Sequence, residues 1–118
     1  MHVYSADPKG LPCWKLVTGL VPFQGANYIH PLKQRKVKEF IDYVNDKYPE
    51  IDMICIFGSS VTPYCHPGSD IDVVIGGVNK HRFVPPDNDI YDIIWADSIT
   101  PGSSFANEIT RKGVVVYG

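Results

Sequence analysis

Two aspartates, Asp70 and Asp72, open an otherwise apolar stretch of the sequence, "SDIDVVIG". In a β-strand, residues i and i+2 point to the same face, so these carboxylates would lie side by side, with Cα atoms about 6.6 Å apart. Like charges at this range need a metal ion, a proton or a cationic side chain to offset their repulsion. Oxygen-only ligands favour a hard cation such as Mg²⁺, which proteins hold together with substrate phosphates. The pair therefore predicts a metal site that serves a phosphate-bearing substrate.

A third carboxylate, Asp92, lies inside the apolar run "IYDIIWA". Aspartate has a poor strand propensity and is costly to bury without a partner. Its position is explained if this strand neighbours Asp70 and Asp72, so that three carboxylates converge on metal. We interpret Asp89 and Asp97 as surface residues that flank the strand, with Asp89 as an alternative third ligand. The competing interpretation is two surface carboxylates and one hydrogen-bonded aspartate, without metal.

Upstream of the aspartates, the stretch "IFGSS" places Gly58 and Ser59 where a strand should end in a turn. Glycine lets a backbone approach a phosphate closely, and exposed N–H groups beside a serine hydroxyl can bind an anion. Ten residues separate Ser59 from Asp70, so the chain can return from this turn to the carboxylates. The sequence therefore predicts an anion site next to the metal site.

The segment from His30 to Glu50 has the pattern of one amphipathic helix. Pro31 suits a first helical turn, and Pro49 should end the helix. Apolar residues recur on one helix face; they are Val37, Phe40, Ile41, Val44 and Tyr48. Basic residues crowd the first half, where the helix dipole disfavours them; they are Lys33, Arg35, Lys36 and Lys38. We expect a solvated basic face, with contact to an acidic partner as the alternative.

Four short runs rich in β-branched and aromatic residues follow the helix and predict strands. They span residues 53–57, 72–75, 90–96 and 113–118. Between the last two runs, Ser103 or Ser104 could cap a short helix that Gly113 ends. This order of elements predicts an α/β (α+β) fold, a small mixed sheet with helices packed on one face.

Length indicates the domain organisation, and net charge argues against an extended basic surface while leaving a local basic patch open. A chain of 118 residues suggests one domain. We expect residues 31–118 to form it, with residues 1–30 as an arm in which "CWKLVTGLVPF" could supply one or two short strands. The formal net charge of −2 argues against a domain-wide basic surface for nucleic acid.

The cysteines and the apolar segments bear on location. Three cysteines cannot all pair, and Cys55 lies in an apolar run, so we expect reduced thiols and a cytoplasmic protein. The first residues lack the apolar stretch of a signal peptide, and no run approaches the roughly 18 apolar residues of a membrane span. We therefore expect no membrane partner.

Together these residues form the pattern G-S-x10-D-x-D, which resembles the signature of the nucleotidyltransferase superfamily related to DNA polymerase beta. The small size resembles its minimal nucleotidyltransferase (MNT) branch. The resemblance covers about residues 31–118 and is most specific over 56–76. Asp92 supports it, as does the closing "NEITRKGVVVYG", which is similar to the helix–glycine–strand ending of such domains.

The resemblance implies a nucleoside triphosphate substrate, two Mg²⁺ ions and transfer of a nucleoside monophosphate to a hydroxyl. By position, it implies that Asp70, Asp72 and Asp92 bind metal and that Asp92 also helps to activate the acceptor. It implies that Gly58, Ser59 and Ser69 bind the nucleotide. The chemistry agrees with the residue types, because paired metal ions can stabilise the attacking and leaving oxygens of an in-line displacement.

One stretch departs from the family pattern. After its serine the family often continues with a small residue, an arginine and a glycine, whereas this chain has Val61, Thr62 and Pro63. The usual arginine is absent. Thr62, His66 and Lys80 are the candidates to replace it.

We therefore predict a Mg²⁺-dependent nucleotidyltransferase that transfers AMP from ATP. A single small domain leaves little room for an acceptor pocket, so a macromolecular acceptor is expected. Resemblance to minimal members implies a HEPN-type ribonuclease toxin as partner, which the chain would neutralise as an antitoxin by adenylylating it. One alternative is a non-catalytic partner-binding module on the same fold. Another is a small-molecule nucleotidyltransferase whose acceptor pocket is completed in a homodimer.

Overall fold

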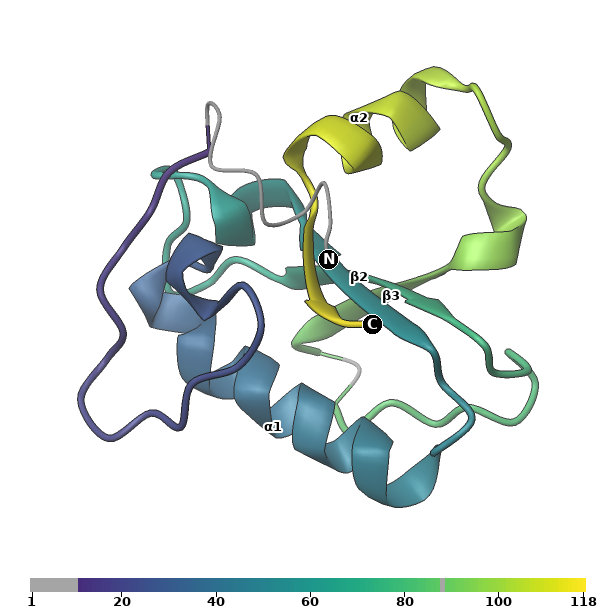
Figure 1. Ribbon diagram of the computed structural model, residues 1–118, viewed down its shortest axis with the longest axis horizontal. Helices are drawn as coiled ribbons and strands as arrows, with labels where there is room; N and C mark the ends of the chain where they lie inside the picture. The colour runs from purple at the N-terminus through teal and green to yellow at the C-terminus, as the bar shows by residue number, and fades with distance from the viewer. Residues whose placement is uncertain (1–10, 88) are drawn as a thin grey trace.

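The computed structural model describes residues 11–87 and 89–118, and Figure 1 shows how its elements are arranged. The helices are α1 (Pro31–Lys47) and α2 (Ser104–Lys112), with 3-10 turns η2 (Ala26–Tyr28), η3 (Gly58–Val61) and η4 (Ala96–Ser98). The strands are β1 (Met53–Phe57), β2 (Ile71–Gly76), β3 (Tyr91–Trp95) and β4 (Val114–Tyr117). Each of the two helices and four strands predicted from residue 30 onward is therefore present, with boundaries displaced by a few residues at most.

The strands form one four-stranded sheet in the order β3-β2-β1-β4. Strand β1 pairs antiparallel with both β2 and β4, whereas β2 and β3 run parallel. Because β1 is antiparallel to β2 and β2 is parallel to β3, the end of β1 meets the starts of β2 and β3. The predicted fold class, α+β with a small mixed sheet, is confirmed.

Helix α1 begins and packs as its sequence predicts. His30 caps it, with Nδ1 accepting a hydrogen bond from Leu32 N at 3.1 Å, and Pro31 occupies the first turn. The predicted apolar face is buried in the main core, where Phe40 and Val44 have no exposed surface. That core covers one face of the sheet, because the alternate residues Ile54 and Ile56 of β1 belong to it.

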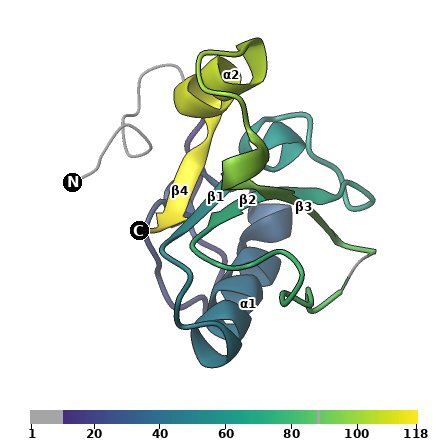
Figure 2. The same cartoon turned by 90° about the vertical axis from the view of Figure 1, so that its right-hand side faces the viewer.

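Helix α2 packs on the other side of the sheet, as Figure 2 shows. Its Ile109 contacts a second cluster of Cys55, Val74 and Val115, which alternate along their strands with the residues of the main core. The sequence predicted that the helices pack on one face of the sheet. Instead α1 packs on the face of the main core and α2 packs on the second face, whose apolar residues would otherwise be exposed. No helix of the described residues is long and apolar enough to cross a membrane.

Residues 11–30 contain no strand, so the short strands predicted in "CWKLVTGLVPF" are absent. The buried Gln34 side chain holds this segment instead. Its Oε1 accepts a hydrogen bond from Val17 N at 2.7 Å, and its Nε2 donates one to Lys15 O at 3.0 Å. Gly25 lies against the side chains of Val114 and Val116 on the edge strand β4. Residues 11–30 of the arm thus pack on the core, whereas residues 1–10 lie outside the described residues, and the proposed domain boundary at residue 30 stays a prediction.

Candidate active site

The parallel pairing of β2 and β3 places Asp72 directly opposite Asp92. Their neighbours Ile71 and Tyr91 point into the main core, so the two aspartates face the side of the sheet that carries α2. Opposed residues on one face of neighbouring strands have closely spaced side chains. The predicted meeting of these two carboxylates is therefore present in the structure.

The surroundings of Asp72 disfavour its charge. Partial burial is the largest cause, followed by the negative charges of Asp92 and Asp70 and contact with the Asp92 carboxyl, and together they raise the pKa of Asp72 to about 6. A carboxylate with a raised pKa beside other carboxylates is typical of a functional site. A cation at this position would relieve the repulsion.

Gly58 forms the floor beneath Asp72. It follows β1, whose last residue Phe57 is paired with Asp72 in the sheet. Its φ of +74° lies in the left-handed region that favours glycine. A Cβ at this position would lie 2.2 Å from Asp72 Oδ2, so only glycine lets the carboxylate occupy this place.

Asp70 lies just outside the strand, immediately before β2, and is exposed. Asp70 therefore does not share β2 with Asp72 as the sequence suggested. Its negative charge is one of the causes that raise the pKa of Asp72. The turn before it is tied together by Ser69, whose Oγ accepts from His66 N at 3.1 Å and whose N–H donates to His66 O at 2.9 Å. Ser69 therefore shapes the loop that delivers Asp70.

Lys33 is a residue of this region that sequence reasoning placed on a solvated face. It is only 6% exposed, and its ammonium donates to the carbonyl oxygens of Ser69 at 2.5 Å and Pro67 at 3.3 Å. The expectation for Lys33 was wrong, because a long side chain in a first helical turn can reach across to a neighbouring loop. Helix α1 thereby holds the loop that precedes Asp70.

The turn after Gly58 carries two serines with different surroundings. Ser59 is half-buried, and its carbonyl accepts hydrogen bonds from the N–H and the hydroxyl of Thr62, both at 3.0 Å. Ser60 is fully buried, and its hydroxyl is the one buried side-chain polar atom without a partner among residues 11–87 and 89–118. No pattern in the sequence distinguishes it from Ser59.

The three candidates to replace the missing arginine lie in different places. Thr62 follows η3 beside Gly58. His66 is exposed, and its Nδ1 accepts from Gly68 N at 3.2 Å within its own turn. Lys80 follows β2 at the end opposite Asp72, which separates it from the carboxylates by the length of the strand.

The residues fit a divalent cation by their chemistry. Within the described part of the chain, no three His, Cys, Asp or Glu side chains form a ready metal cluster. Mg²⁺ does not require one, because it is held by one or two carboxylates together with waters and substrate phosphates. The opposed pair Asp72 and Asp92, with the charge of Asp70 nearby, supplies such a set of hard oxygen donors.

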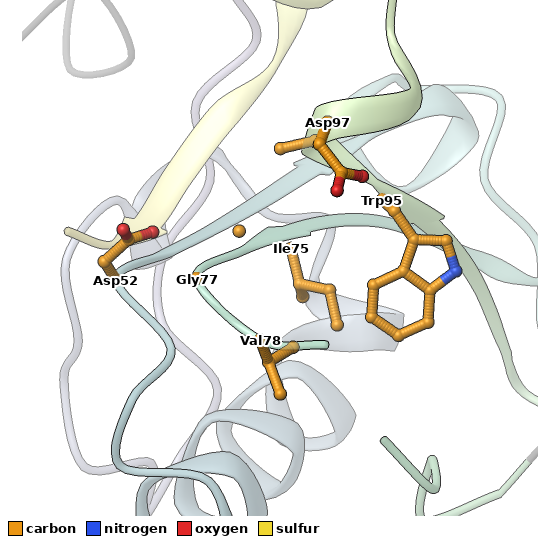
Figure 3. A pocket seen from close by; sticks show the side chains of 8 residues that line it. Asp52, Ile75, Gly77, Val78, Trp95 and Asp97 are labelled. Atoms are coloured by element: carbon orange, nitrogen blue, oxygen red, sulfur yellow. The ribbon is translucent and has the colours of Figure 1, made fainter. Parts of the chain in front are cut away.

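A separate cavity of about 500 Å³ lies at the far ends of β2 and β3. Figure 3 shows the side chains of Asp52 and Asp97 on opposite sides of this cavity, with the Trp95 ring on the side of Asp97. None of the residues of the G-S-x10-D-x-D pattern lines it. Asp97 is exposed there, as predicted, and Asp89 is exposed near the start of β3.

Comparison with known protein families matches residues 37–98 to the nucleotidyltransferase domain. Comparisons with curated proteins and with solved structures give no match. The matched segment covers more than half of the chain and contains Gly58, Asp70, Asp72 and Asp92. Proteins of this family generally use a nucleoside triphosphate and a divalent metal. On the strength of this match, the chain belongs to the nucleotidyltransferase domain family.

Proposed function

We propose that this chain is a Mg²⁺-dependent nucleotidyltransferase that transfers AMP from ATP to a hydroxyl of a macromolecular acceptor. The observation that carries the proposal is the opposition of Asp72 and Asp92 across β2 and β3, with Gly58 directly beneath Asp72. Asp72, Asp92 and Asp70 are the residues that would hold the metal ions.

In the proposed reaction, the acceptor oxygen bonds to the α-phosphorus of ATP, and the bond from that phosphorus to the bridging oxygen breaks to release pyrophosphate. Bound Mg²⁺ would supply neutralisation of charge on the phosphate oxygens. Backbone N–H groups at Gly58 and Ser59, with Ser69, would bind and orient the phosphate chain. Asp92, exposed at the start of β3, would accept the proton of the acceptor hydroxyl.

A macromolecular acceptor is supported by the exposure of the site. Asp70 and Asp92 are both exposed on the surface, so an acceptor held by its own fold can present a hydroxyl from outside. The resemblance to minimal nucleotidyltransferases extends this proposal to a HEPN-type toxin as acceptor, with the chain acting as its antitoxin in the cytoplasm.

The first experiment is calorimetric titration of ATP into the protein with and without Mg²⁺, for wild type and Asp72→Asn. Asp89→Asn is the matched control, because Asp89 is an exposed aspartate just before β3 that is not opposite Asp72 in the sheet. We expect Mg²⁺-dependent binding that Asp72→Asn abolishes and Asp89→Asn retains. If the protein binds ATP, it is then incubated with α-labelled ATP and a candidate toxin. We expect the label to be transferred to that toxin.

Three results would contradict parts of this proposal. Loss of binding in Asp89→Asn but not in Asp92→Asn would make Asp89 the third carboxylate. Binding without label transfer to any macromolecule, but with transfer to a small alcohol, would favour the homodimeric small-molecule enzyme. No binding to wild type, alone or with its partner, would favour a non-catalytic module.

A further inference from the structure

A second hollow lies beside Gly58 and extends the candidate site toward α2. It has a volume of about 330 Å³ and is lined by Phe57, Gly58, Val61, Thr62, Phe105, Glu108 and Lys112. Small-molecule sites typically occupy about 300–1,000 Å³, so one ring system fits this space. Gly58 lines this cavity and also lies against the carboxylate of Asp72.

The walls of this cavity are apolar and aromatic. Phe57 at the end of β1 and Phe105 in the first turn of α2 meet edge to face, with ring centroids 5.6 Å apart and an interplanar angle of 79°. Phe105 remains 39% exposed, so part of its ring is accessible to a ligand in the cavity. Val61 completes the apolar lining.

The α2 side of the cavity carries one acceptor and one donor. Glu108 and Lys112, one turn apart on α2, form an ion pair at 3.0 Å. The hydrogen bond from Lys112 is the main cause that lowers the pKa of Glu108, so at neutral pH the pair offers a carboxylate that accepts and an ammonium that donates. Apolar walls with a few polar groups that fix orientation are typical of a ligand pocket.

We propose that this cavity binds the nucleobase of the triphosphate, stacked against Phe105 with its polar edge at Glu108 and Lys112. The inference rests on the proposed function, since it needs the phosphate chain to lie at Gly58 and Ser59. Phe105, Glu108 and Lys112 lie outside the segment matched to the family, residues 37–98. Base binding would thus be carried by residues of α2, which follows the matched segment.

The test compares ATP with inorganic tripolyphosphate, which carries the same phosphate chain without a base. Both are titrated, with Mg²⁺, into wild type, Phe105→Ala and Tyr64→Ala. Tyr64 is the matched control, because its ring is 84% exposed and lies outside the cavity. Loss of one aromatic stacking partner should weaken ATP binding about tenfold. We expect that loss in Phe105→Ala alone, with tripolyphosphate affinity unchanged.

The outcomes separate this inference from the function on which it rests. If ATP binds wild type with Mg²⁺ dependence and Phe105→Ala leaves it unchanged, the base pocket is wrong while the proposed function stands. Equal weakening of ATP and tripolyphosphate would also overturn the pocket, because Phe105 would then shape the phosphate site. If wild type binds neither ligand, both proposals fail. Phe105→Leu, which keeps the apolar packing of α2 but not the ring, should reproduce the loss in a fully folded protein.

Discussion

The carboxylate of Asp72 rests on the bare Cα of Gly58, so that a methyl group at residue 58 would lie 2.2 Å from Asp72 Oδ2. Gly58→Ala should therefore displace Asp72 as well as strain a backbone with φ of +74°. We expect it to lower the free energy of unfolding by about 2–4 kcal/mol, from left-handed strain and overpacking together. Mg²⁺-dependent ATP binding should be lost, as measured by calorimetry.

Gly102→Ala is the control for this variant. Gly102 also has a left-handed φ, +79°, but nothing lies within 4 Å of where its Cβ would stand. It should show the backbone strain of about 1–2 kcal/mol alone and keep ATP binding. Equal effects of the two substitutions on binding would show that the contact with Asp72 has no role.

Because Asp72 and Asp92 lie opposite each other, we expect Asp92 to lower the stability of the metal-free protein and to support binding of Mg²⁺ with ATP. Asp92→Asn removes one of two like charges placed opposite each other and should raise the free energy of unfolding of the metal-free protein by about 0.2–1 kcal/mol. The same change should abolish the rise in melting temperature that Mg²⁺ with ATP gives the wild type. Urea unfolding and thermal unfolding measure the two effects.

Asp97→Asn serves as the comparison, since Asp97 is exposed at the other end of β3. It should leave both quantities near the wild-type values. Destabilisation by Asp92→Asn without metal would mean that its carboxylate is held by favourable contacts, against the arrangement argued here.

Local sequence patterns were sufficient for the elements and for the pair of opposed aspartates. The 3.6-residue repeat of apolar residues that ends at Tyr48 correctly indicated which face of α1 is buried. Ser103 caps α2 as predicted, with its Oγ accepting a hydrogen bond from Ala106 N at 3.1 Å. An aspartate within an apolar run indicated a neighbouring strand that carries the other carboxylates, and the structure places Asp72 opposite Asp92. The burial on which that prediction partly rested is absent, because Asp92 is exposed near the start of β3.

Contacts distant in sequence could not be predicted in this way. Lys33 bonds to Ser69, 36 residues away, and a lysine in a first helical turn has the same local pattern whether it is buried or solvated. The position of α2 on the second face also depends on strand order, which period-two alternation does not determine.

Lys33 should support the loop that carries Asp70 rather than the stability of α1 alone. Lys33→Met keeps the apolar stem but removes the donor to the carbonyls of Pro67 and Ser69. Two part-buried carbonyls without a donor should cost about 1–3 kcal/mol of unfolding free energy. Amide hydrogen exchange in residues 66–70 should accelerate more than exchange elsewhere. Lys36→Met, which breaks an exposed pair with Glu39 on the same helix, should change stability by less than about 1 kcal/mol. Exchange that rises uniformly in Lys33→Met would contradict a local role.

Cys55 predicts how stability depends on alkaline pH. Burial raises the pKa of its thiol to about 12, whereas an unfolded cysteine titrates near about 8.5. The unfolded chain therefore loses this proton first, and the stability contributed by the protonated thiol falls as pH rises from about 8.5 toward 12. In urea unfolding with reductant, the stability difference between wild type and Cys55→Ala should shift by about 2 kcal/mol against the wild type between pH 7 and pH 10. Cys13→Ala, which removes an exposed thiol, should follow the wild-type curve. Parallel curves for wild type and Cys55→Ala would mean that the Cys55 thiol ionises as readily in the folded protein as in the unfolded chain.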